Sequence, residues 1–364
     1  MRTLPLLALL LAACPAVTPG GADDDDDTPD YPDVEEYDFA AAAPWFACPE
    51  ADSLPEEVQV ATVFDAEDAF FGNLADDPDG TPNRRDIDAV ANLPTADWKQ
   101  VGLWFELECP ESGLCDHWDR AGSLQIALDP DADEPEWVEL SRYVTPYRRG
   151  MCQFIDVTPM ANLLQGRVRF RNWIDTWVGP GHAQGEGWRV TAKLAYWPGP
   201  PAGARVSNVW GRRSITVGEV EADANVDYQI TPLQFSIAGN ATRVEAHLIT
   251  TGHSFGNSGN CAEFCSMTHR ITLDGQDFDT NPWRDDCDQN PVSPQSGTWE
   301  YPRNGWCPGA TSVGHVVDIT DAVTPGEPQE LDFDILLANG LEYDNGSPVD
   351  LLPYTFVSLK LYTY

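Results

Sequence analysis

The stretch Val168-Arg-Phe-Arg-Asn-Trp-Ile174 alternates apolar and polar side chains with a period of two. Successive side chains of a β-strand point to opposite faces, so Val168, Phe170 and Ile174 share one face. The other face continues beyond the stretch on both sides and carries Arg167, Arg169, Arg171, Trp173, Asp175 and Trp177. This pattern predicts a strand with one face in a core and the other polar.

The same alternation recurs in three other segments, residues 188–196, 331–335 and 355–361, with turns rich in Gly, Pro and Asn between them. The chain of 364 residues holds 29 Gly and 30 Pro, which favours a turn-rich β protein over a helical bundle. Only residues 160–165 suggest a turn or two of helix. The sequence therefore predicts an all-β fold.

A break in the strand pattern falls at Pro198-Gly-Pro-Pro-Ala-Gly203. Pro and Gly at this density are incompatible with a strand and make a short, stiff connection. We therefore expect an interdomain linker at residues 199–204. It separates an N-terminal β-sandwich domain at residues 44–198 from a C-terminal one at residues 205–364.

The first residues of the chain read as an export signal. Arg2 precedes a short apolar stretch that ends in Leu11-Ala-Ala-Cys14, which resembles a bacterial lipobox. Residues 1–13 are therefore predicted to be a lipoprotein signal peptide and Cys14 the lipidated residue, with an ordinary cleaved signal peptide as the alternative. The apolar stretch is too short to span a bilayer. We expect an exported, membrane-anchored bacterial lipoprotein that faces the periplasm or the cell surface.

Charge is strongly negative and unevenly distributed. Lys and Arg number 21 and Asp and Glu number 59, for a formal net charge of −38. Between Arg2 and Arg84 there is no basic residue, and this region holds the acidic run that begins at Asp23. Residues 14–43 are predicted to be an acidic, disordered tether, because like charges repel and little can be buried. A calcium site in the acidic run is the less favoured alternative, because glycine-broken ligand spacing is missing. The net charge excludes a nucleic-acid binder that works by neutralising phosphates.

Nine cysteines leave an even number once Cys14 is assigned to lipid attachment. Exported proteins meet an oxidising compartment, so four disulfides are expected. The expected pairs are Cys109–Cys115, Cys261–Cys265, Cys287–Cys307 and Cys48–Cys152. A zinc site made of Cys261, Cys265, His269 and a later cysteine is the alternative.

Three polar segments bounded by these cysteines are candidates for a functional site. In the first, a Cys109–Cys115 disulfide would hold the residues up to Arg120 rigidly. In the second, a Cys261–Cys265 disulfide would display Glu263 after a Gly-rich loop.

The third segment is a long Pro-rich loop between Cys287 and Cys307, and loops of this length are usually functional. It carries Trp299, Arg303 and Trp306, which are suited to stacking on a sugar and to bonding its oxygens. From these residues alone we expect an exported two-domain β protein with a polar, Trp-rich site that acts on carbohydrate.

Together the three segments resemble the bacterial peptide-N-glycosidase F family, amidases that remove whole N-linked glycans from asparagine. The matching motifs occur in the family's order between about residue 85 and the C-terminus. They are Cys115-Asp-His-Trp-Asp-Arg120, Val144-Thr-Pro-Tyr147, Ile155-Asp-Val157, Asp175-Thr-Trp177, Gly252-His253, Cys261-Ala-Glu-Phe-Cys265, Asn290-Pro291 and Arg303-Asn-Gly-Trp-Cys-Pro-Gly309. The resemblance implies two jelly-roll-like antiparallel β-sandwich domains packed side by side, with the site at their interface. It also implies the three local disulfides.

The resemblance further implies roles for individual residues. It makes Asp119, Glu263 and Asp175 catalytic, and it assigns substrate binding to Arg120, Arg303, Trp118, Trp177 and His253. Asp119 would activate a water, or attack directly, at the amide carbonyl, with Glu263 assisting proton transfer. The family normally has glutamate where this chain has Asp175, one methylene shorter. No metal or cofactor is expected.

The expected partner is an N-linked glycoprotein or glycopeptide. The chain is expected to be a monomer that binds no nucleic acid and meets the membrane through its lipid anchor alone. Three other functions remain open: a non-catalytic glycan-binding surface lipoprotein on the same scaffold, a glycosidase with two carboxylates, and a copper monooxygenase. The last is the least favoured, because the six histidines include no His-x-His pair.

Overall fold

The computed structural model describes residues 29, 31–50, 52–72, 82–218, 225–254, 261–344 and 352–364. The predicted signal peptide, Cys14 and residues 14–28 of the tether lie outside the described residues. Within these ranges, no helix has the length and apolar character needed to cross a membrane. Residues from Pro32 to Tyr364 form one compact unit.

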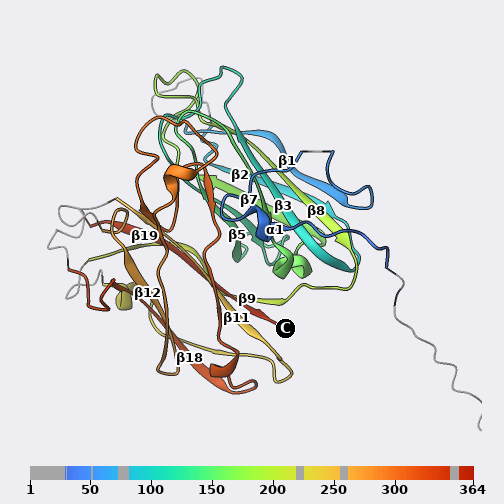
Figure 1. Cartoon of the computed structure of the whole chain (residues 1–364), viewed down its shortest axis with the longest axis vertical. Helices are drawn as coiled ribbons and strands as arrows, with labels where there is room; N and C mark the ends of the chain where they lie inside the picture. Colours follow the sequence, from blue (N-terminus) through green and yellow to red (C-terminus); the bar gives the residue numbers. More distant parts are fainter. Residues whose placement is uncertain are drawn as a thin grey trace, which may run out of the picture. The chain divides into compact units, whose positions relative to one another are not determined.

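Two antiparallel sheets form the first β-sandwich. One has the strand order β1-β8-β3-β6 and the other β16-β5-β4-β7-β2, and β1, β3 and β8 run side by side in Figure 1. The bounds are β1 (Gln59–Ala69), β2 (Asp86–Leu93), β3 (Trp98–Glu108), β4 (Ala121–Ala127), β5 (Trp137–Val144), β6 (Met151–Asp156), β7 (Gly166–Ile174), β8 (Trp188–Pro198) and β16 (Ala310–Ser312). Their inward faces form one continuous apolar core.

Two further antiparallel sheets form the second β-sandwich, with the orders β17-β11-β19-β9 and β10-β18-β12-β13. The bounds are β9 (Arg205–Thr216), β10 (Leu233–Ser236), β11 (Val244–His253), β12 (Met267–Leu273), β13 (Gln276–Thr280), β17 (His315–Asp318), β18 (Pro328–Leu337) and β19 (Tyr354–Thr363). A separate two-stranded ribbon pairs β14 (Trp283–Arg284) with β15 (Arg303–Asn304). This sandwich has its own apolar core.

Helix is confined to short elements in the described residues. They are α1 (Phe39–Ala42), α2 (Val226–Gln229) and the 3₁₀ turns η1 (Thr158–Leu163), η2 (Cys287–Gln289) and η3 (Thr320–Ala322). The predicted all-β fold is confirmed, and η1 falls where the sequence suggested a helical turn.

The alternating stretch that predicted the fold lies in β7. Val168, Phe170 and Ile174 are buried, whereas the arginines between them are partly exposed. Asn172 also faces the core, where its Oδ1 accepts a 2.9 Å hydrogen bond from the hydroxyl of Tyr143. This hydrogen bond explains why a polar residue is tolerated at a core-facing position of the strand.

Residues 199–204 contain no strand, because β8 ends at Pro198 and β9 begins at Arg205. The connection at residues 199–204 is not the only link between the two halves of the chain. The short strand β16, far along the chain, pairs with β5 and extends a sheet of the first sandwich.

A buried ion pair within β5 is hydrogen-bonded to the second sandwich. Arg142 Nη2 contacts Glu139 Oε2 at 2.6 Å, and both side chains are 1% exposed. The same arginine donates from Nη1 to the carbonyl of Phe356 at 2.6 Å, and Lys360 donates to the carbonyl of Glu139 at 2.8 Å. Because each charge is bonded on several sides, the network specifies how β5 sits against β19.

The tether is shorter than the sequence predicted. Val34 and Phe39 are buried, and they pack with Phe154 and Trp197 of the first sandwich. The indole of Trp197 also donates to the carbonyl of Glu35 at 3.1 Å. Residues 34–43 are therefore part of the folded domain, because the apolar side chains of this acidic segment pack against the first sandwich.

Candidate functional site

Asp119 lies two residues before β4, and one oxygen of its carboxylate makes two interactions. The hydroxyl of Tyr147 donates a 2.7 Å hydrogen bond to Asp119 Oδ2. Arg303 Nη2 lies 3.6 Å from the same oxygen. The Asp119 side chain is 17% exposed, so it keeps access to solvent while its orientation is held.

Glu263 approaches the same arginine from the second sandwich. Arg303 Nε donates to Glu263 Oε1 at 3.2 Å, and the backbone N–H of Ser254 donates to Oε2 at 3.1 Å. The Cys261–Cys265 disulfide closes the turn that carries Glu263. A glutamate and an aspartate from different domains thus flank one guanidinium.

Arg303 lies in β15 and is fully buried. Its Nη1 donates to the carbonyls of Thr298 and Tyr301, each at 2.9 Å, and its Nη2 donates to the Thr298 hydroxyl at 2.9 Å. The guanidinium also lies 4.7 Å from the centroid of the Trp306 ring. A planar cation with this many fixed contacts is preorganised and needs no rearrangement to hold two carboxylates.

The two carboxyl groups differ in their electrostatic surroundings. Burial raises the pKa of Asp119, against the hydrogen bond from Tyr147 and the charge of Arg303. Burial and the charge of Asp119 raise the pKa of Glu263 to about 7. Glu263 is therefore partly protonated near neutral pH, as a general acid requires.

Arg120 pairs with a residue that the sequence did not single out. Its Nε donates to Asp116 Oδ2 at 2.9 Å, and Asp116 has no exposed surface. The other contacts of Asp116 come from the Thr176 hydroxyl at 2.7 Å and the backbone N–H of Trp118 at 3.0 Å. Asp116 thus ties the segment before β4 to the segment after β7, and Arg120 reaches Asp119 only through its longer-range charge.

Asp175 follows β7 directly and is one-quarter exposed. Arg85 Nη2 pairs with Asp175 Oδ1, and the Arg85 guanidinium lies 4.3 Å from the centroid of the Trp177 ring. The backbone N–H of Asp175 donates to the carbonyl of Ala121, which places it beside the Asp119 segment. Asp175 is thus neutralised by its own arginine and makes no direct contact with Arg303.

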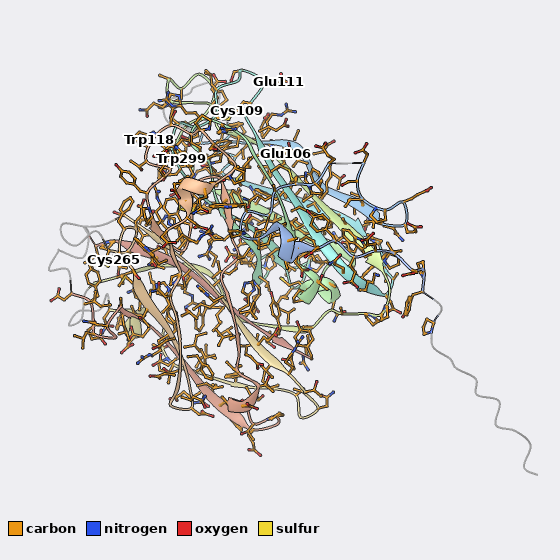
Figure 2. The ribbon with its side chains drawn as sticks, in the orientation of Figure 1. Glu106, Cys109, Glu111, Trp118, Cys265 and Trp299 are labelled. Carbon is orange, nitrogen blue, oxygen red and sulfur yellow. A yellow bond between two sulfur atoms is a disulfide. The ribbon has the colours of Figure 1, made fainter. Side chains whose placement is uncertain are left out.

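The exposed tryptophans are those expected to wall a cleft. Trp118 is 46% exposed and Trp177 is 53% exposed. Figure 2 shows the side chains of this region, with Trp118, Trp299 and Cys265 labelled. The expectation that Trp299 and Trp306 offer stacking faces is wrong, because they are 9% and 2% exposed. The Trp306 ring instead lies against Arg303, and its indole donates to the Gly252 carbonyl at 2.7 Å.

His253 was expected to line the cleft, but it is only 7% exposed. Its ring stacks at 5.3 Å on Trp306 and at 5.4 Å on Tyr354. Burial, with the charges of Arg142 and Arg303, lowers the pKa of His253 to about 3. The imidazole is therefore neutral and supports the ring that lies against Arg303.

Four disulfides are present, and they are the four expected pairs. Cys261 and Cys265 are thus bonded to each other, which removes two ligands of the alternative zinc site. In the described part of the chain, no three His, Cys, Asp or Glu side chains gather as a metal site.

Sequence reasoning gave no role to four residues that shape the site, namely Tyr147, Thr298, Asp116 and Arg85. Tyr147 and Asp116 lie within the motifs that match the family, so their position in these motifs could have indicated a place in the site. Thr298 and Arg85 lie outside any motif, and they reach the site only because the fold brings their segments to it.

The chain is similar in sequence to known proteins. Residues 222–336 match the model of the family described as Peptide-N-glycosidase F, C terminal. The chain is 28% identical over 282 residues to Peptide-N(4)-(N-acetyl-beta-D-glucosaminyl)asparagine amidase F of Elizabethkingia miricola, covering 73% of this chain and 74% of that protein. The resemblance predicted from the motifs is confirmed.

Solved structures show the same fold. PNGase F from Flavobacterium meningosepticum superposes with a TM-score of 0.69 at 19% identity, over 85% of this chain and 96% of that one. PNGF-II superposes with a TM-score of 0.61 at 16% identity, over 84% of this chain and 66% of that one. Both likenesses support the two-sandwich architecture.

Proposed function

We propose, from the resemblance to the peptide-N-glycosidase F family and from the Asp119–Arg303–Glu263 cluster, that this protein is an exported N-glycan amidase. It would hydrolyse the bond between the asparagine side-chain carbonyl and the GlcNAc nitrogen of a glycoprotein or glycopeptide. The products would be the intact glycan and aspartate. The observation that carries the proposal is one buried arginine held between two carboxyl groups, of which Glu263 has a pKa raised to about 7.

In this proposal Asp119 acts at the amide carbonyl as the base that takes a proton from the attacking water. The oxygen of the water bonds to the carbonyl carbon, and the carbon–nitrogen bond then breaks. Glu263, with its pKa near 7, supplies the proton that the leaving nitrogen requires. Arg303 stabilises the negative charge that develops on the carbonyl oxygen, since its position is already fixed.

The remaining predicted residues would bind substrate. Trp118 and Trp177 offer exposed ring faces to the sugars nearest the peptide. Arg120 and Asp175 lie on the same segments as these tryptophans and would bond sugar hydroxyl groups. His253 would act indirectly, by holding Trp306 against Arg303.

The cellular setting belongs to the same proposal. Four disulfides indicate folding in an oxidising compartment. Anchoring through lipidated Cys14, with the protein acting as a monomer on glycoproteins outside the cytoplasm, is consistent with this setting. Palmitate labelling of the expressed chain and of a Cys14→Ala variant tests the anchor.

The decisive test is mass spectrometry of an N-glycopeptide incubated with the enzyme in H₂¹⁸O. The proposal requires a free intact glycan and a peptide in which asparagine has become ¹⁸O-labelled aspartate. Asp119→Asn should abolish both products. A GlcNAc left on the peptide would instead show a glycosidase, and full activity of Asp119→Asn would remove Asp119 from the mechanism.

One observation favours a second candidate, a glycan-binding protein without catalysis. Asp175 is shorter than the family's glutamate and is paired with Arg85, so it is less free to act on substrate. Binding of an N-glycopeptide without any release of glycan would support this candidate over the amidase.

A further inference from the structure

A groove of about 520 Å³ lies on the surface of β4, β5, β7 and β9, and its lining includes none of Asp119, Glu263 and Arg303. Its lining includes Arg171, Arg212, Arg213, Trp137 and Trp210, and we call it the arginine groove. Three cations in one groove are unexpected on a chain whose net charge is −38. The lining sets these three arginines against one acidic residue, Glu136, and so carries a local excess of positive charge on an acidic protein.

Each of these arginines lies over a tryptophan ring. The distances from the guanidinium carbon to the ring centroid are 4.3 Å for Arg171 on Trp137, 3.8 Å for Arg212 on Trp173 and 5.9 Å for Arg213 on Trp210. Stacking on an aromatic face fixes a guanidinium without using its N–H donors. Arg212 and Arg213 are thereby held in place with N–H donors still available, whereas Arg171 also uses Nε and Nη2 to bond Asp88.

Two of the three cations form no direct ion pair. Among the described residues, neither Arg212 nor Arg213 forms a hydrogen bond or an ion pair through its guanidinium, whereas Arg171 bonds Asp88. Burial lowers the pKa of Arg212 to about 10, with Glu139 and Asp86 opposing this shift. Arg212 stays charged at neutral pH, and Glu139 and Asp86 offset only part of its charge without forming an ion pair with it.

The arginine groove adjoins the proposed cleft. The ring of Trp173 has Arg212 at 3.8 Å and Arg85 at 6.0 Å from its centroid. Arg85 in turn pairs with Asp175 and stacks on the exposed Trp177. A branched glycan seated at Trp177 could therefore extend toward the groove.

We propose that the arginine groove binds the carboxylate or sulfate group of an acidic sugar. The anion would bond the free N–H groups of Arg212 and Arg213, and Asn208 and Gln125 at the groove wall would accept or donate to neighbouring hydroxyls. Glu136 is the acidic residue of the lining, and Asn208 Nδ2 donates to it at 2.8 Å. That the sugar belongs to an N-glycan rests on the proposed function.

Calorimetry of the mature protein with three probes tests the groove without requiring hydrolysis. We expect 3′-sialyllactose or 3′-sulfolactose to bind at least about tenfold more tightly than lactose at low salt, and added salt to weaken that binding. The better of the two anionic probes identifies the preferred group. Equal affinity for all three sugars would overturn the proposal.

Arg213→Gln is the variant of choice, because Arg213 is exposed and its guanidinium lies no nearer than 5.9 Å to the centroid of the Trp210 ring. We expect it to weaken binding of the anionic sugar about fivefold or more, with lactose unaffected. Arg205→Gln is the matched control, since Arg205 is exposed on the same strand outside the groove. Unchanged binding by Arg213→Gln would show that these arginines only cover tryptophan faces.

The two proposals fail separately. Glycan release from a glycopeptide, with no preference for anionic sugars, would contradict the arginine groove alone. Preferential binding of an anionic sugar, lost in Arg213→Gln but with no glycan release by the wild-type protein, would contradict the amidase alone.

Discussion

The hydroxyl of Tyr147 donates a 2.7 Å hydrogen bond to Asp119 Oδ2, the oxygen that also faces Arg303. Tyr147 comes from the segment after β5, and its hydroxyl also lies 3.3 Å from that of Thr298. The bond favours the ionised form of a carboxyl group whose burial disfavours ionisation. Tyr147 therefore sets both the direction and the basicity of the proposed base.

Tyr147→Phe should lower activity without unfolding the protein. Loss of the hydrogen bond raises the pKa of Asp119 further, so the acid limb of the pH–kcat profile should move to higher pH. We expect kcat to fall about tenfold near pH 6 and less at pH 8. A uniform loss at every pH would contradict this role, and Tyr301→Phe, an exposed tyrosine nearby, is the control.

The pH dependence of glycan release should be bell-shaped. Asp119 must be ionised to act as the base, so activity falls as the pH drops through its raised pKa. Glu263 must be protonated to act as the acid, so activity falls as the pH rises through about 7. Glu263→Gln should lower kcat and remove the alkaline limb. An alkaline limb that survives in this variant would assign it to another group.

Asp175→Glu should raise kcat/KM for a glycopeptide by a fewfold. The added methylene restores the family's residue and carries the carboxylate further toward the cleft, beyond its pairing with Arg85. Asp175→Asn, which keeps the size but removes the charge, is the matched comparison. Equal kinetics of Asp175→Glu and wild type would show that the shorter side chain is already compensated by Arg85.

Arg142→Met should destabilise the whole protein, because it leaves Glu139 charged and buried without its partner. We expect a loss of about 3–5 kcal/mol in the free energy of unfolding, measured by urea denaturation. The double variant Glu139→Met/Arg142→Met should recover much of this loss, since no unpaired charge remains. A double variant as unstable as the single one would show that Arg142 acts mainly through its bond to the Phe356 carbonyl.

Local patterns predicted much of the fold. The alternation in residues 168–174 predicted β7 because a strand places neighbours on opposite faces wherever it lies. The break after Pro198 fell between β8 and β9 for an equally local reason, since Pro cannot donate to a ladder. Local patterns do not predict which strands pair. Nothing in the residues of β16 or β5 indicates that these two strands are neighbours.

The site divides in the same way. Residue types and family motifs selected Asp119, Glu263 and Arg303, because their chemistry is carried by the side chains themselves. The type of a residue does not determine how exposed its side chain is. Trp306 was expected at the surface and His253 in the cleft, but both are buried. Partners were equally hidden, as Arg85 and Asp175 are 90 residues apart in the chain.

The sequence by itself thus determined the strand-rich architecture, the disulfide pairs and the identity of the charged groups. Only the tertiary structure decided which charges meet, because burial and distance depend on packing between segments far apart in the chain. Arg303 held between Asp119 and Glu263 is the clearest case, since the raised pKa of Glu263 arises from burial and a neighbouring charge. Neither cause exists until the two sandwiches are folded together.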